Sequence, residues 1–434
     1  MNSSQEQRWQ IPFFAIWIGQ AFSLIGSEVA GFALVWWLTK TTGSATVLTM
    51  STMAAILPGV VLGPFVGALV DRWSRKRVML AADGFVALVA VWLVYLFWSG
   101  SMQVWHLYVA LAARSLGEAF HWPAMQASTS LMVPEKHLSR VAGLNQSIRG
   151  GLNVVAPPLG ALLLELLPLH GIMGIDVVTA GLAMTTLLFV TIPQPQRADA
   201  EAGQMPSVWG DVRAGLRYVR GWPGLMAILG MAMIINFVVN PSFSLMPLLV
   251  TDHFQGGALQ LGWLQSAWGV GVVAGGLLLS VWGGFRRRIY TSLLGMVIAG
   301  VGIAAVGLVP GSGFVWAVSA LFVAGAMNPL INGPLFAILQ ATVAPEMQGR
   351  IFTLVSSFAT AMMPLSLAIA GPLADAVGVR PWYVVGGIVF SLVGVVGFFI
   401  PAIVKVEENG HGRKAPAEPQ AQGVPAAGGA PVAD

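Results

Sequence analysis

Three charged side chains stand inside long apolar stretches of the sequence, where an ionised group is expensive to keep. The first, Glu28, follows Gln20, Ser23 and Ser27 at spacings that place these polar residues on one helix face. A carboxyl group in apolar surroundings can gain or lose a proton near neutral pH, which is the chemistry of a proton carrier. The competing interpretations are a permanent ion pair with an arginine and contact with water at the end of the helix.

The other two charges, Arg114 and Glu118, are four residues apart and share a helix face. They form either a neutral ion pair that allows membrane insertion, or a switch in which Arg114 keeps the carboxylate ionised until a proton releases it. Three further charges suggest simpler roles. We expect Arg149 to reach the membrane surface, Asp176 to lie at the positive end of a helix, and Asp83 to pair with a nearby basic loop.

Amide and aromatic side chains predict a solute cavity. Asn236 and Asn240 are four residues apart, as are Asn328 and Asn332. The full set of cavity candidates is Gln20, Trp122, Gln126, Asn236, Asn240, Gln265, Asn328 and Asn332. An apolar, aromatic cavity with few formal charges suits large amphipathic solutes better than sugars or phosphates. Hydrogen bonding between helices is the competing use of these amides.

The sequence offers few residues for catalysis or metal binding. The chain has no cysteine, and its six histidines do not show the helical spacing of a zinc site. No nucleophile–base pair is visible, so we expect neither an enzyme, a metal site nor a cofactor. Nothing indicates a nucleic-acid partner. Helix kinks or close packing are expected at Pro157, Pro158 and Gly160, and again at Pro372.

These residues must be positioned by membrane-spanning helices. The chain is 56% hydrophobic and only 9% charged, whereas soluble domains carry about 25% charged residues. About 20 apolar residues suffice to cross a bilayer. Twelve stretches qualify: 12–38, 44–70, 78–98, 103–131, 141–166, 172–192, 224–251, 259–282, 290–309, 314–343, 351–376 and 382–404. The sequence therefore predicts an all-α, multi-pass membrane protein with twelve transmembrane helices.

Charge outside these stretches predicts their orientation. Eighteen of the 22 Lys and Arg residues fall on one side, while only Lys40 and Arg380 fall on the other. The positive-inside rule then places both termini in the cytoplasm and the chain in the plasma (inner) membrane. The densest basic loop, residues 67–77, lies between the second and third stretches.

The long break at residues 193–222 divides the stretches into two sets of six. We expect an N-terminal six-helix bundle over 1–192 and a C-terminal six-helix bundle over 223–404. The break itself is a cytoplasmic linker, and Trp209, Val212, Leu216 and Val219 recur in it at the spacing of an amphipathic surface helix. The tail, 405–434, is rich in Ala, Pro and Gly and is expected to be disordered.

The loop pattern G-x-x-x-D-R-x-x-R-K-R at residues 67–77 resembles the loop 2–3 signature of the Major Facilitator Superfamily of secondary transporters. That resemblance implies a conformational latch at Gly67, Asp71, Arg72 and Arg75. Together with Lys76, these residues would make contacts that exist in only one state of two rocking bundles. Such contacts would bias the equilibrium between outward-facing and inward-facing states.

Further motifs resemble those of macrolide-efflux-type drug:proton antiporters. They are Ile16-Trp17-Ile18-Gly19-Gln20, Thr42-Gly43-Ser44-Ala45, Arg114-Ser115-Leu116-Gly117, Ala119-Phe120-His121, Val133-Pro134-Glu135 and Ile175-Asp176-Val177. In drug:proton antiporters the arginine of the Arg-x-x-Gly motif belongs to the proton pathway. The segment 156–161 resembles a further antiporter signature, G-P-x-x-G-G, with Ala156 and Ala161 replacing glycines.

The resemblance implies a monomeric secondary transporter that exports hydrophobic or amphipathic small molecules by proton antiport and alternating access. Glu28, Arg114 and Glu118 are the candidates for proton coupling. Two alternatives remain open at this point: a dedicated exporter of a metabolite such as a siderophore, and a non-transporting membrane sensor.

Overall fold

The computed structural model describes residues 9–192, 217, 219–343 and 345–408, except for some side chains inside helices, among them those of Gly67, Asp71 and Arg72. Within that part of the chain every regular element is helical. The twelve long helices are α2 (Gln10–Thr42), α3 (Ala45–Arg72), α4 (Arg75–Trp98), α5 (Val104–Met132), α6 (Glu135–Leu166), α7 (Leu169–Phe189), α9 (Pro223–Leu248), α10 (Ala258–Trp282), α11 (Arg288–Leu308), α12 (Phe314–Thr342), α13 (Pro345–Val377) and α14 (Arg380–Phe399). A π-helical turn, Leu249–His253, extends α9, and the short α15 (Pro401–Val404) follows α14.

The prediction of an all-α protein with twelve long helices is confirmed. Eleven helices among the described residues are long and apolar enough to cross a membrane. The twelfth, α5, is long enough but carries Arg114, Glu118 and two histidines, which lower its hydropathy. Strongly apolar side chains such as Val281 (89% exposed) and Phe399 (79%) point away from the protein. Water would penalise that arrangement, whereas lipid favours it.

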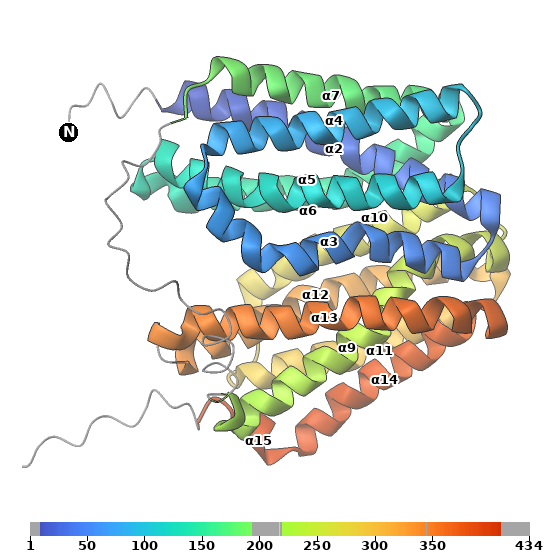
Figure 1. Ribbon diagram of the computed structural model, residues 1–434. Helices are drawn as coiled ribbons and strands as arrows, with labels where there is room; N and C mark the ends of the chain where they lie inside the picture. The colour runs from blue at the N-terminus through green and yellow to red at the C-terminus, as the bar shows by residue number, and fades with distance from the viewer. Residues whose placement is uncertain (1–8, 193–216, 218, 344, 409–434) are drawn as a thin grey trace, which may run out of the picture.

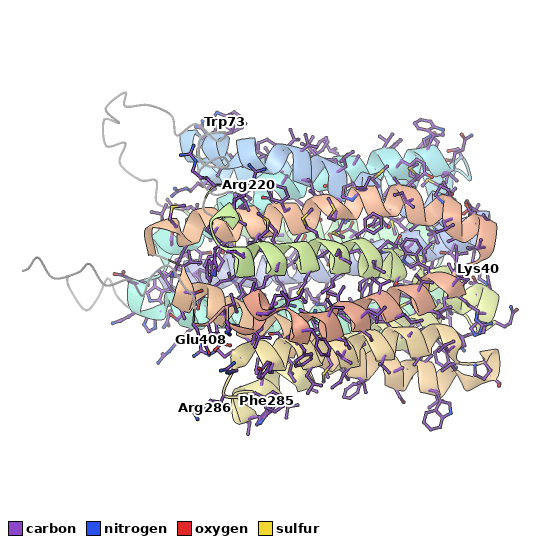
Figure 2. The ribbon with its side chains drawn as sticks, turned by 90° about the horizontal axis from the view of Figure 1, so that it is seen from below. Lys40, Trp73, Arg220, Phe285, Arg286 and Glu408 are labelled. Atoms are coloured by element: carbon purple, nitrogen blue, oxygen red, sulfur yellow. The ribbon has the colours of Figure 1, made fainter. Side chains whose placement is uncertain are left out.

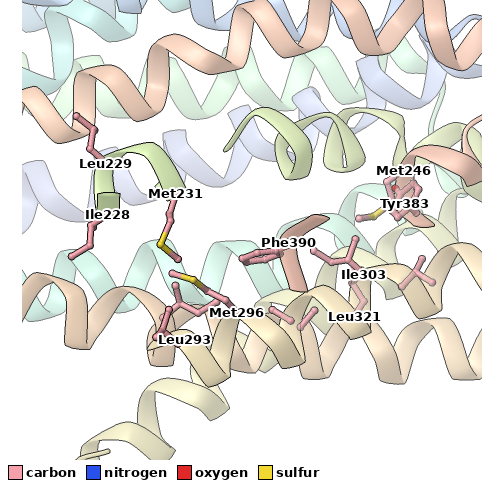
Figure 3. Packing of buried hydrophobic residues seen from close by; sticks show 14 of the residues in the cluster. Ile228, Leu229, Met231, Met246, Leu293, Met296, Ile303, Leu321, Tyr383 and Phe390 are labelled. Atoms are coloured by element: carbon pink, nitrogen blue, oxygen red, sulfur yellow. The ribbon is translucent and has the colours of Figure 1, made fainter. Parts of the chain in front are cut away.

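The helices form two bundles, one above the other in Figure 1. The first contains α2 to α7 and the second α9 to α14. Within the first bundle α2 and α4 pack on α7, and within the second α11 packs on α12 and α14. Figure 3 shows part of the core of the second bundle, where Met231, Met296 and Phe390 pack together. The bundles meet along two helix pairs, α3 with α13 and α6 with α10.

The two ends of the molecule differ in charge. Figure 2 shows Trp73, Arg220, Arg286 and Glu408 at one end and Lys40 at the other. We call the first the basic end, because the Arg75–Lys76–Arg77 and Arg286–Arg287–Arg288 turns lie there, and the second the opposite end.

The chain stays packed past the predicted boundary at residue 404. Val406 is fully buried, the Glu407 carboxylate accepts a hydrogen bond from the backbone N–H of Ile289 (2.9 Å), and Glu408 pairs with Arg287 (3.0 Å). Trp209, Val212 and Leu216 of the proposed surface helix, with most of the predicted linker and residues 409–434 of the predicted tail, lie outside the described residues. Val219 and Trp222 at the end of the linker are described, and both are buried in the core of the second bundle, so the expected linker and surface helix do not extend to residue 222.

Asp375, in the last turn of α13, joins the bundles at the opposite end. Its carboxylate accepts hydrogen bonds from the backbone N–H groups of Ala45 (2.6 Å) and Thr46 (3.0 Å) and from the Ser44 hydroxyl (3.0 Å). It therefore caps the N-terminus of α3, where unpaired N–H groups and the helix dipole favour an anion. Gly371 makes the close approach possible, since a Cβ there would clash with Thr49.

The second contact between the bundles, α6 with α10, includes the predicted Pro157–Pro158 pair. Proline lacks an N–H group, so the carbonyl of Val154 loses its partner within α6. The Ser266 hydroxyl of α10 donates to that carbonyl instead, at 2.7 Å. A Cβ at Gly262 of α10 would lie only 3.1 Å from the Pro157 oxygen. The two prolines therefore allow α6 and α10 to pack closely, in addition to changing the backbone hydrogen bonding of α6.

Several hydrogen bonds join the bundles in the half nearer the opposite end. Besides those of Asp375 and Ser266, they join Ser244 of α9 to the hydroxyl of Thr52 (2.7 Å) and the carbonyl of Leu48 (3.4 Å). These polar contacts hold the bundles together near the opposite end.

Candidate functional site

A buried ion pair lies within the N-terminal bundle. Arg114 of α5 and Asp176 of α7 are 8% and 1% exposed, and Arg114 Nη1 lies 2.5 Å from Asp176 Oδ2. Ser27 of α2 donates its hydroxyl to the other carboxylate oxygen at 2.9 Å. Asp176 was expected at the positive end of its helix, but α7 begins at Leu169, two turns earlier. Asp176 instead neutralises a cation held between three helices.

This pairing corrects a sequence-based expectation about Arg114. Arg114 was expected to pair with Glu118 one turn away on its own helix. Its partner is instead Asp176 of α7, because the bundle brings a buried carboxylate, already held by Ser27, to the guanidinium. A buried, hydrogen-bonded pair retains more Coulomb energy than an exposed pair on one helix.

Glu28 and Glu118 have no ion-pair partner among the described residues. Both are exposed. Glu28 lies within electrostatic reach of Glu118, Arg114 and Arg149. Glu28 was expected to share one helix face with Gln20 and Ser27. The Gln20 and Ser27 side chains instead point into the bundle, toward Asp83 and Asp176, whereas the Glu28 side chain is exposed. The two glutamates thus lie near arginines that other residues hold in place.

A second, part-buried set of polar side chains lies nearer the basic end. His121 Nε2 of α5 is 3.3 Å from Asp83 Oδ1 of α4, and Gln20 of α2 donates to Asp83 Oδ2 at 2.9 Å. Asp83 was expected to pair with the basic loop and Gln20 to line the cavity. Both instead contact each other inside the N-terminal bundle. The sequence analysis missed the role of His121, and its i, i+3 spacing from Glu118 was the available signal.

One face of α5 carries Glu118, Trp122 and Gln126, spaced four residues apart and all exposed. The Arg149 guanidinium of α6 lies 3.8 Å from the centre of the Trp122 ring. Arg149 was expected to extend to the membrane surface; its cation–π contact with Trp122 holds it beside this face instead. The predicted cavity candidates Trp122 and Gln126 therefore belong to a polar face on the N-terminal bundle.

The C-terminal bundle contains a cavity of about 410 Å³. The predicted Asn236, Asn240, Asn328 and Asn332 all line it, brought together from α9 and α12. Trp268 and Phe243 form an edge-to-face pair in its wall, with ring centroids 4.7 Å apart. Helix α11 also contributes to the cavity wall, through residues that include Leu293 and Met296. The sequence analysis did not identify them, because an apolar residue that lines a cavity has the same pattern in sequence as one that packs in a core.

The amide groups of this cavity are partly committed to their own helices. Asn236 donates to the Ala232 carbonyl, Asn240 to the Asn236 carbonyl and side-chain oxygen, and Asn332 to the Asn328 carbonyl. This leaves acceptor oxygens and apolar walls for a solute. Gln265, the remaining candidate, is half-buried on α10 and is not among the residues that line the cavity.

The predicted latch is described only in part. The Lys76 ammonium donates to the carbonyls of Leu188 (2.9 Å) and Val190 (2.8 Å), which fixes the loop to the C-terminus of α7. Gly67, Asp71 and Arg72 lie in the last turns of α3, but their side chains are outside the described set. Arg75 begins α4. The latch therefore stays a prediction. No three His, Asp or Glu side chains in the described ranges gather as metal ligands would.

Comparison with known proteins agrees with this architecture. Residues 16–366 match the family model of the Major Facilitator Superfamily. The chain is 34% identical over 399 residues to macrolide efflux protein A of Streptococcus pyogenes, covering 92% of this chain and 98% of that protein. It is 26% identical over 395 residues to the multidrug efflux pump Tap of Mycolicibacterium fortuitum, covering 88% and 94%. A bacterial homologue of the iron transporter ferroportin, solved in an inward-facing state, superposes with a TM-score of 0.66 at 15% identity, covering 90% and 99%.

Proposed function

This chain belongs to the Major Facilitator Superfamily as a macrolide-efflux-type transporter, and we propose that it exports amphipathic small molecules, macrolides among them, in exchange for protons. The basic end faces the cytoplasm of a cell whose plasma membrane holds the protein, with both termini on that side. Macrolides are named by the 34%-identical relative, and an apolar cavity with amide oxygens and no formal charge suits amphipathic solutes of that kind.

The separation of charge from cavity is the observation that carries this proposal. Glu28, Glu118 and Arg114 cluster in the N-terminal bundle, whereas the amide-lined cavity lies in the C-terminal bundle. A proton that binds a glutamate beside fixed arginines changes the electrostatic balance of one bundle only. Because the described polar contacts hold the bundles together at the opposite end, the arrangement suits an inward-open state of an alternating-access cycle.

Glu28→Gln tests the coupling. The amide cannot carry the proton, so we expect pH-gradient-driven export of erythromycin from proteoliposomes to fall by about a hundredfold, the scale of losing a proton-transfer group. Membrane insertion should be unchanged, because Glu28 is exposed and unpaired among the described residues.

Glu165→Gln is the matched control, since Glu165 is also an exposed glutamate but lies in the last turn of α6 at the opposite end. Export by Glu28→Gln at the wild-type rate would remove Glu28 from the mechanism. Absence of any gradient-driven flux in the wild-type protein would overturn proton antiport itself.

A further inference from the structure

One titratable pair in the N-terminal bundle has no part in the exchange described so far. His121 of α5 and Asp83 of α4 meet at 3.3 Å with side chains 19% and 13% exposed, and Gln20 of α2 holds the second carboxylate oxygen. Ionisable groups within membrane-spanning helices are expensive and commonly mark ion pathways. Neither residue faces the amide-lined cavity of the other bundle.

The pair lies between the exposed glutamate of α5 and the basic end. α5 runs toward the basic end, and His121 follows Glu118 by three residues, about 4.5 Å further along the axis and on a neighbouring part of its surface. Asp83 lies eight residues after the start of α4 at that same end, about 12 Å along the axis. Two helices thus place titratable groups at one depth, below the glutamates and above the basic turns.

The helices packed around the Asp83–His121 pair offer few other side chains that could bind a proton. α2 brings Gln20 and, two turns away, Glu28; α7 brings Asp176, which is already paired with Arg114. α6 brings Arg149, which lies over Trp122. α3 has no titratable residue before Asp71 in its last turn. Among the described residues, the recorded carboxylate contact of the His121 imidazole is therefore with Asp83.

We infer that the Asp83–His121 pair is the station from which the coupling proton leaves toward the basic end. The inference rests on the proposed proton antiport. The O–H bond of protonated Glu118 breaks and an N–H bond forms on the His121 imidazole, giving an imidazolium that the Asp83 carboxylate stabilises. The imidazolium then releases its proton to water at the basic end. Imidazole suits this step because it changes charge within the physiological pH range, and Gln20 is a positioning residue for Asp83.

His121→Gln in proteoliposomes tests the inference through two fluxes of radiolabelled erythromycin. One is export driven by an imposed pH gradient, and the other is exchange of labelled for unlabelled erythromycin without a gradient. Gradient-driven export should fall at least about tenfold, because the proton acceptor is gone, while exchange should stay near the wild-type rate. Equal loss of both fluxes would show a merely structural pair and would overturn the inference.

Asp83→Asn provides a second variant that keeps the imidazole and an oxygen for Gln20. The pH at half-maximal export should move about one unit toward acid, because the imidazolium loses its counter-charge. An unshifted pH profile would contradict the inference. His137→Gln is the control, since that histidine stacks on Trp9 at the basic end with ring centroids 5.4 Å apart. If wild-type export is gradient-driven and His121→Gln matches it, only this inference fails; if wild-type export ignores the gradient, the proposed function fails first.

Discussion

The two bundles share an architecture and differ in their electrostatics. In the N-terminal bundle, α2, α4, α5 and α7 all place ionisable side chains at membrane depth, where they form one buried ion pair and one part-buried contact between a histidine and a carboxylate. In the C-terminal bundle, α9, α10 and α12 hold no Asp, Glu, Lys, Arg or His at all. Asparagine amides from α9 and α12 line the cavity of this bundle. The proposed function therefore assigns the response to protons to the N-terminal bundle and the contact with an uncharged part of the solute to the C-terminal bundle.

The largest effect should come from breaking the buried pair of the N-terminal bundle. Asp176→Asn leaves Arg114 as an uncompensated buried cation, which destabilises a protein by about 3–5 kcal/mol. We expect a much lower thermal midpoint in detergent and loss of export. The double variant Arg114→Gln/Asp176→Asn removes both charges and should recover most of the thermal stability without recovering gradient-driven export. A single variant as stable as wild type would show that the pair does not support the bundle.

The C-terminal bundle should respond differently. Asn240→Leu removes an amide from the cavity wall, and we expect the KM for erythromycin export to rise about tenfold, the scale of one lost hydrogen bond in a site. The pH dependence of export should stay as in wild type. Gln265→Leu, on α10 but outside the residues that line the cavity, is the matched control. A change in the pH dependence of export in Asn240→Leu would contradict the proposed division of roles between the bundles.

The smallest effect concerns the seam that joins the bundles. Asp375→Asn keeps one acceptor oxygen for the N-terminus of α3 but loses the charge, worth about 0.3–1 kcal/mol against a helix dipole. The equilibrium should move by a few-fold toward states open at the opposite end. Because the chain has no cysteine, Ala232→Cys in the cavity wall would be the sole thiol for an impermeant maleimide added from outside.

Labelling should be a few-fold faster in the Asp375→Asn background. Asp252→Asn, a carboxylate near the same end that accepts only a local bond from Thr251, should leave the rate unchanged. Equal rates in all three backgrounds would remove Asp375 from the closure of that end.

Parts of the site were accessible to sequence reasoning because they follow from residue type and spacing. The paired asparagines on α9 and α12 were assigned to the cavity that they line, and Pro157 and Pro158 to a backbone device. The partners of the charged residues were not accessible. Arg114 was matched with Glu118 because only contacts within one helix can be read from spacing, whereas Asp176 and Ser27 reach it from helices distant in sequence.

The sequence alone determined the helical class and the number of long helices, because lipid requires each span to satisfy its own backbone hydrogen bonds. Only the tertiary structure decided which charges neutralise one another, where the cavity lies and how Asp375 and Ser266 join the bundles. Those outcomes depend on the rotation and tilt of each helix against its neighbours. Side-chain packing across helices sets these angles, and a linear pattern does not contain them.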